Sequence, residues 1–239
     1  MKIAFFSDIH GNLQALDAIL ADLPVCDEVI CLGDILSLGP DSDKCLDRII
    51  DAGITMVLGN HDLYCVNGPE NDPSLTPRQR PHLLWVRSLM ADRQMNFLKA
   101  CPLEVRRAVG GKDVLFVHYP IAHAGEFYPF ASPEELATPE RRAVICSADL
   151  TFFGHEHSGY AWTDAGMLCI GSSGCRMDDT TYYYTIDDSC VPEKHELKYD
   201  RSALEAAFER VPMPERPMLA LRNFGLKLPD QPSMPIRKA

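Results

Sequence analysis

The stretch MKIAFFSDIHGN (residues 1–12) carries the strongest indication of the fold. Its apolar segment Ile3–Phe6 has the length and composition of a buried β-strand, and it runs into the polar residues Asp8 and His10. Asn12, a good helix N-cap, then precedes leucine and isoleucine residues at helical spacing. The pattern predicts a strand followed by a helix, with chemically capable side chains where the strand ends.

Four further apolar segments are predicted to be buried strands, and each also ends at residues that can ligate a metal. These are residues 29–32 before Gly33-Asp34, 55–58 before Gly59-Asn60-His61-Asp62, 114–117 before His118, and 150–153 before Gly154-His155-Glu156-His157. Helical stretches separate the first three strands, which indicates β-α-β-α-β order and a parallel sheet. Because ligands bind at the carboxyl ends of strands in α/β sheets, we expect these residues to share one crevice.

The candidate ligands form a mixed oxygen and nitrogen set without a thiolate, which suits manganese, iron or zinc. They are Asp8, His10, Asp34, Asn60, His118, His155 and His157. Such a set is too large for one ion and fits two divalent ions that share a carboxylate. Paired ions of this kind clamp the attacking and leaving oxygens in phosphoryl transfer.

The ordered motifs Asp8-Ile9-His10, Gly33-Asp34, Gly59-Asn60-His61-Asp62, His118 and Gly154-His155-Glu156-His157 resemble those of the calcineurin-like metallophosphoesterases. The resemblance covers residues 1–187 and is greatest to the small prokaryotic branch of phosphodiesterases and phosphatases. It implies a four-layer α/β/β/α sandwich of two mixed sheets. It also implies an enzyme, a metal-dependent hydrolase of a phosphate ester or anhydride.

The resemblance further implies a role for each residue of the motifs. One ion would be held by Asp8, His10, Asp34 and His157, and the second by Asp34, Asn60, His118 and His155. A metal-bound hydroxide would attack phosphorus. His61 would act as a catalytic residue that stabilises the developing charge or protonates the leaving oxygen, and Asp62 would orient it.

Four residues are candidate contacts for the substrate, a small-molecule phosphate ester: Asn60, His61, His123 and Arg176. For Arg176 a surface salt bridge is an equally good interpretation. Glu156 and the pair Tyr119-Pro120 depart from the pattern common in related chains, so the substrate stays open. A nucleotide is preferred on the resemblance alone, without a choice between monoester and diester.

Composition limits the other function classes. The net charge of −11 argues against a broad nucleic-acid interface. Nine cysteines without a C-x-x-C pair predict reduced thiols. No segment approaches the ~18 apolar residues of a membrane span, and the first residues do not resemble a signal peptide. We therefore expect a cytoplasmic protein without a membrane partner, while homo-oligomer formation stays open.

The second half of the chain is predicted to be rich in antiparallel strands, at residues 160–163, 167–170 and 181–186, before a helix at 202–211. Prolines are frequent after that helix: Pro212, Pro214, Pro217, Pro229, Pro232 and Pro235. We therefore predict a metallophosphoesterase domain at residues 1–211 and an irregular arm at 212–239, the first part of which docks on another surface.

A non-catalytic binding scaffold with the same fold is the alternative function. Such a scaffold is expected to lack His61 or some of the metal ligands. All of them are present in this sequence, which favours the enzyme.

Overall fold

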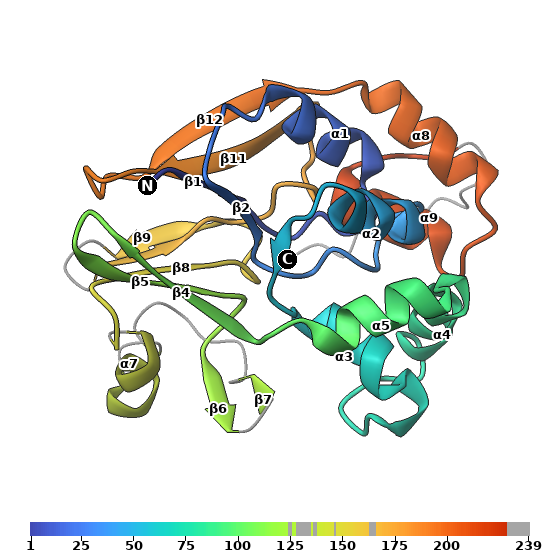
Figure 1. The fold of residues 1–239 in the computed structure, drawn as a ribbon. Coiled ribbons are helices and arrows are strands. Elements are labelled where there is room, and N and C mark those ends of the chain that lie inside the picture. Colours follow the sequence, from blue (N-terminus) through green and yellow to red (C-terminus); the bar gives the residue numbers. More distant parts are fainter. Residues whose placement is uncertain (124–125, 128–134, 136–137, 146, 163–165, 229–239) are drawn as a thin grey trace.

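The computed structural model describes residues 1–123, 126–127, 135, 138–145, 147–162 and 166–228 (Figure 1). Its centre consists of two five-stranded sheets. The first has the order β12-β11-β1-β2-β3, with bounds Glu193–Lys198, Thr180–Ile186, Ile3–Phe6, Glu28–Cys31 and Thr55–Met56. The second has the order β4-β5-β8-β10-β9, with bounds Glu104–Val109, Lys112–Val117, Leu150–Phe153, Met167–Cys169 and Tyr160–Trp162.

Both sheets are mixed, which confirms the predicted fold class. Strands β1, β2 and β3 run parallel, and β11 joins the other side of β1 in antiparallel register, with Phe5 opposite Tyr184. In the second sheet, β8 lies parallel to both β5 and β10, whereas β4 and β9 are antiparallel edge strands. All five strands predicted to end at ligands are therefore present, and β3 is shorter than expected.

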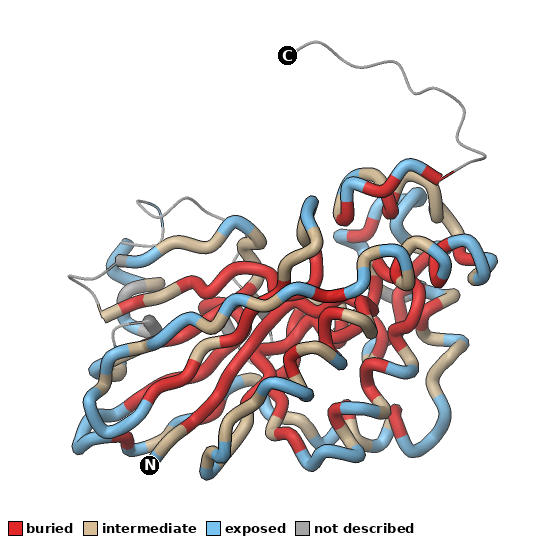
Figure 2. Tube along the Cα trace, turned by 90° about the horizontal axis from the view of Figure 1, so that it is seen from above, coloured by how far each residue is buried: buried red, intermediate tan, exposed pale blue. Residues whose placement is uncertain are grey.

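The layers follow from the alternation of side chains along β1. Ile3 and Phe5 point into a core between the two sheets, where the Phe5 ring lies 5.4 Å from Phe116 and 4.6 Å from Phe152. Ala4 and Phe6 point to the opposite face, which is packed against helices. Figure 2 shows the buried residues concentrated along these central strands.

Helices lie on the outer face of the first sheet and beside it (Figure 1). They are α1 (Leu13–Asp22), α2 (Ser42–Asp51), α3 (Asn60–Asn67), α4 (Arg80–Leu89) and α5 (Asp92–Ala100), with a short 3-10 turn at Pro69–Asn71. Asn12 caps α1 as predicted, because its side chain accepts a hydrogen bond from the amide of Ala15 at 3.1 Å. The outer side of the second sheet carries β6 (Ile121–His123), β7 (Glu126–Phe127) and α7 (Pro139–Ile145).

The prediction that prolines exclude regular structure after Val211 is wrong for part of the segment. Helix α8 (Arg201–Arg210) is followed by a second helix, α9 (Arg216–Phe224). Pro217 lies in the first turn of α9, where a proline is tolerated because the backbone N–H there would lack a helical partner. Phe224 packs against Phe208 of α8, with ring centroids 5.2 Å apart, so the segment docks on its own chain.

Two expectations from composition can be compared with the described part of the chain. All eight cysteines within it are free thiols, and Cys146 lies outside the described residues. None of the helices described there is long and apolar enough to cross a membrane.

Candidate metal centre

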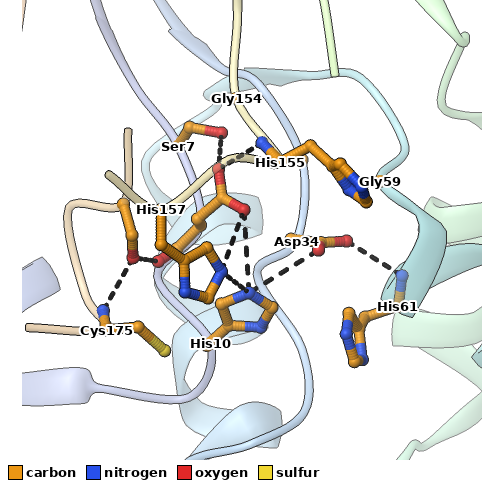
Figure 3. A network of polar contacts seen from close by, with 12 residues as sticks. Ser7, His10, Asp34, Gly59, His61, Gly154, His155, His157 and Cys175 are labelled. Carbon is orange, nitrogen blue, oxygen red and sulfur yellow. Dashed lines mark hydrogen bonds and ion pairs between the residues drawn. The ribbon is translucent and has the colours of Figure 1, made fainter. Parts of the chain in front are cut away.

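The carboxyl ends of five strands bring the seven predicted ligands to one place between the sheets. β1, β2 and β3 of the first sheet lead to Asp8, His10, Asp34 and Asn60, and β5 and β8 of the second lead to His118, His155 and His157. Figure 3 shows side chains from both groups pointing toward a common centre. Three groups of His, Asp and Cys side chains there have potential ligand atoms within 4.8 Å of one another.

Asp8 is fully buried, and its two carboxylate oxygens have different surroundings. Oδ2 accepts hydrogen bonds from the Ser7 hydroxyl and from the amide of His155, the latter at 3.0 Å. Oδ1 has no hydrogen-bond partner among the described residues, and it lies 3.7 Å from Nε2 of His10 and 3.6 Å from Nε2 of His157. A buried carboxylate oxygen without a donor, facing two imidazole nitrogens, is in the environment expected of a metal ligand.

Asp34 lies between two histidines that the family resemblance assigns to different ions. Its Oδ1 accepts a hydrogen bond from the amide of His61 at 2.9 Å. Its Oδ2 lies 3.6 Å from Nε2 of His10 and 3.4 Å from Nε2 of His118. One carboxylate therefore faces both halves of the centre, as a shared ligand must.

Backbone carbonyls hold the rings of two predicted ligands in place. Nδ1 of His10 donates to the carbonyl of Leu36 at 3.0 Å, and Nδ1 of His118 donates to the carbonyl of Leu32 at 2.8 Å. These bonds leave Nε2 of each ring facing the centre, an arrangement typical of metal-ligating histidines. Nε2 of His10 then lies 3.1 Å from Nε2 of His157.

The second half of the centre is organised around Asn60, the first residue of α3. Its Oδ1 lies 3.2 Å from Nε2 of His118 and 2.9 Å from Nδ1 of His155. An amide oxygen and two imidazole nitrogens therefore meet, with the Asp34 carboxylate beside them. Amide oxygen, imidazole nitrogen and carboxylate oxygen are all ligand types that a divalent ion accepts.

The charges of the centre also favour a cation. Although burial alone would raise it, the neighbouring His10 and His157 hold the pKa of the Asp8 carboxyl well below its usual range. Burial opposes protonation of His118, but the Asp34 carboxylate raises the pKa of that imidazole to about 9. Burial lowers the pKa of His61 to about 3 and that of His155 to about 4. The carboxylates of Asp8 and Asp34 thus attract positive charge from their neighbours, and a pair of divalent ions can supply that charge.

The backbone is bent sharply at four of the predicted ligands. Asp8, His10, Asp34 and His155 have φ values of 53°, 51°, 53° and 70°, in the left-handed region that residues other than glycine seldom adopt. Strained backbone of this kind collects at functional sites. The contacts are close as well, because a Cβ atom on Gly154 would clash with the Ser7 hydroxyl and the Asp8 carboxylate.

The structure corrects the prediction that Asp62 orients His61. Oδ2 of Asp62 accepts hydrogen bonds from the amides of Asp34 at 2.8 Å and Gly59 at 2.9 Å, and Oδ1 accepts one from Leu36 at 3.3 Å. Among the described residues, Nδ1 of His61 has no hydrogen-bond partner. Asp62 is therefore occupied by the backbone of the loops after β2 and β3, and it positions Asp34 instead.

The predicted substrate contacts are not all in the centre. The His61 ring lies 5.0 Å from that of His10, between centroids, and belongs to a group with His10 and Asp34. Arg176 forms an ion pair with Asp178 at 3.1 Å and donates to Thr180 at 2.8 Å, which favours the salt-bridge interpretation. His123 lies on strand β6, and its side chain lies outside the described part of the chain.

Three residues of the centre were not predicted from the sequence. The Ser7 hydroxyl donates to Asp8, and the Ser172 hydroxyl donates to the backbone carbonyl of Asp8 at 2.7 Å. The thiol of Cys175 lies near His10 and His157. Ser7 could have been suspected from its place beside Asp8, whereas the other two come close only because the loop after β10 returns to β1.

Comparison of the sequence with known families identifies the class of protein. Residues 1–188 match the calcineurin-like phosphoesterase superfamily domain. The match covers most of the chain, so the chain belongs to this superfamily of phosphate-ester hydrolases.

Individual relatives agree with this membership. An uncharacterised protein of Methanocaldococcus jannaschii is 31% identical over 183 residues, which cover 76% of this chain and 72% of that protein. A symmetrical bis(5'-nucleosyl)-tetraphosphatase of Acidovorax sp. is 32% identical over 162 residues, or 64% of this chain and 54% of the relative. The matched region thus spans about half the length of that tetraphosphatase. The crystal structure of a metallophosphoesterase from Sphaerobacter thermophilus shares the fold, with a TM-score of 0.70, 21% identity, and coverage of 93% of this chain and 97% of the other.

Proposed function

We propose that this protein is a dinuclear-metal-dependent phosphoesterase that hydrolyses an ester or anhydride bond in a small phosphorylated molecule. One observation carries the proposal. The buried carboxylate of Asp34 faces His10 on one side and His118 on the other, at 3.6 and 3.4 Å. A shared carboxylate between two sets of donors is what a pair of divalent ions requires.

The ligand sets follow from the contacts around Asp34. Asp8, His10 and His157 would complete the first position with it, and Asn60, His118 and His155 the second. When bound, two divalent ions would neutralise charge on the phosphate and lower the pKa of a water molecule toward neutrality. The donor types suit manganese, iron or zinc.

His61 is the residue proposed to act on the substrate directly. Its amide is tied to Asp34 at 2.9 Å, which fixes the backbone, and its ring faces that of His10. Because burial lowers the pKa of His61 to about 3, the imidazole is neutral near pH 7 and retains one N–H. That N–H can donate to an oxygen on phosphorus as negative charge develops there.

Local charge explains how an acidic protein would attract a phosphate. The whole chain has a net charge of −11. Two divalent ions would outweigh the carboxylates of Asp8 and Asp34, so the centre itself would be positive. Distant surface charges are screened over about 8 Å at physiological ionic strength, and the local field decides.

The substrate class is proposed from the relatives. A symmetrical bis(5'-nucleosyl)-tetraphosphatase matches 64% of this chain, which supports a nucleotide containing a phosphoanhydride. A cytoplasmic location accords with such a substrate. Asn60 and His61 are the proposed contacts for its phosphate, since both lie at the start of α3 beside the centre.

The test is hydrolysis by metal-stripped and manganese-reconstituted protein. Three substrates are compared: p-nitrophenyl phosphate, bis-p-nitrophenyl phosphate and diadenosine tetraphosphate. We expect turnover of at least one substrate only after reconstitution, and the Asp34→Asn variant, purified identically, reports any contaminating phosphatase. A protein that binds two ions per chain and hydrolyses none of the three would instead support the scaffold.

A further inference from the structure

A cysteine that the proposed reaction does not use lies beside the first metal position. Cys175 follows β10, in a loop that is held against the end of β1. Its amide donates to the Ser172 hydroxyl at 2.8 Å, and that hydroxyl donates to the carbonyl of Asp8 at 2.7 Å. The adjacent amide of Gly174 donates to the same carbonyl at 3.1 Å. The cysteine is therefore positioned by the backbone of a proposed ligand.

The thiol lies close to two imidazoles. Sγ of Cys175 and one ring nitrogen each of His10 and His157 lie within 4.8 Å of one another. Figure 3 shows the sulfur close to these two rings. Zinc binds sulfur at about 2.3 Å and nitrogen at about 2.0–2.1 Å, so two ligands of one ion can be up to about 4.4 Å apart. Small side-chain movements would allow all three to bind one ion.

A second observation points to a cation in this place. Oδ1 of Asp8 is buried, has no hydrogen-bond partner among the described residues, and lies 3.7 and 3.6 Å from Nε2 of His10 and His157. Those two nitrogens are themselves only 3.1 Å apart. One carboxylate oxygen and two imidazole nitrogens thus lie together, a set of atoms that can bind a cation.

Packing is the alternative explanation for the buried thiol of Cys175. Cys175 does belong to an apolar cluster formed with α8 and α9, where a small hydrophobic side chain suffices. The other two groups of potential metal ligands in the described part of the chain contain only histidine and aspartate. Cys175 is thus the one thiol there that adjoins metal-competent groups.

We propose that Cys175 supplies a thiolate ligand to the first metal position, together with His10 and His157, and thereby biases that position toward zinc over manganese. The inference rests on the proposed function, since it refines one of its two metal positions. Thiolates are soft ligands that favour zinc, whereas manganese prefers oxygen donors. On binding, the S–H bond is broken, the sulfur keeps the electron pair, and the proton passes to solvent.

Cobalt(II) spectroscopy of the full-length reduced protein tests the proposal. We expect a near-ultraviolet charge-transfer band from thiolate to cobalt in the wild type and in the Cys26→Ser control. The band should be lost in Cys175→Ser. In competition with a chromophoric chelator, Cys175→Ser should lower zinc affinity at least roughly ten-fold. Replacing a residue that only hydrogen-bonds a metal ligand already costs about 10- to 100-fold in metal affinity. The manganese affinity of Cys175→Ser should change by less than about two-fold.

The outcomes separate this proposal from the proposed function. Cobalt binding without the band, in a protein that hydrolyses phosphate esters, overturns thiolate ligation and leaves the phosphoesterase intact. The band without hydrolysis contradicts the phosphoesterase and supports thiolate ligation. If Cys175→Ser does not fold, absence of the band from the wild type still overturns the proposal, and Cys175→Ala tests the assignment when the band is present.

Discussion

The two sheets contribute different chemistry to the candidate metal centre. The first supplies every oxygen donor, from Asp8, Asp34 and Asn60, and one imidazole. The second supplies only imidazoles, from His118, His155 and His157. Negative charge is therefore concentrated on one side of the junction between the sheets.

Exposure separates the two carboxylates of the first sheet from one histidine of the second. Asp8 and Asp34 are 0% and 2% exposed, and both have left-handed backbones, whereas the His157 side chain is 35% exposed. The first sheet therefore supplies two buried anionic ligands, and the second supplies the buried His118 and the partly exposed His157. We infer that losing the shared carboxylate of Asp34 disrupts both ions, while losing the partly exposed His157 weakens only one.

The largest effect is expected for Asp34→Asn. Removing the shared carboxylate removes the ligand common to both positions, and metal assistance contributes several kcal/mol to such reactions. Turnover of bis-p-nitrophenyl phosphate should fall on the order of a thousand-fold or more, at about 1.4 kcal/mol per factor of ten. Excess manganese should not restore it. Asp17→Asn, an exposed residue of α1 paired with Arg48, should leave turnover unchanged.

A smaller and reversible effect is expected for His157→Ala. The variant keeps both carboxylates, so the first position should still bind metal, but roughly 10- to 100-fold more weakly. Activity measured against manganese concentration should recover at saturation. His195→Ala on β12, where the ring bonds Thr185, is the matched control. A loss as complete and irreversible as that of Asp34→Asn would remove the contrast between the sheets.

Asp62→Asn separates positioning from catalysis. An amide cannot accept all three backbone hydrogen bonds that Asp62 receives from Asp34, Leu36 and Gly59. The free energy of unfolding in urea should fall by about 1–3 kcal/mol. Weaker metal binding should accompany this loss. Normal stability and metal content with strongly reduced turnover would instead restore the predicted role of orienting His61.

The residues of the centre differ in how far the sequence could predict their roles. Apolar segments ending at Asp8, Asp34 and His118 predicted the strands and the ligands together, because a strand end fixes where the next residues lie. The function of Asp62 could not be predicted in this way. Its bond to the amide of Asp34 joins residues 28 positions apart and depends on how two loops pack.

The same reasoning applies to α9 and to Cys175. Proline frequency predicted an irregular segment, but Pro217 falls in the first helical turn, the place where proline does no harm. Cys175 approaches His10 only through the return of the loop after β10 to the end of β1. Periodicity and spacing report local structure, whereas these features depend on tertiary contacts.

The smallest effect is expected for Arg176→Gln. The guanidinium is paired with Asp178 and Thr180, and a partly exposed ion pair contributes about 0–1 kcal/mol. KM for bis-p-nitrophenyl phosphate should change by less than about two-fold, as for Arg48→Gln, another arginine paired with an aspartate. A ten-fold rise in KM for Arg176→Gln alone would return this residue to the substrate site.

Anomalous diffraction from crystals grown with manganese tests the central claim most directly. The account predicts two peaks, one on each side of the Asp34 carboxylate. The first should be bounded by His10 and His157, and the second by His118 and His155. A single peak, or strong peaks away from Asp34 with this centre empty, would contradict a shared carboxylate between two ions.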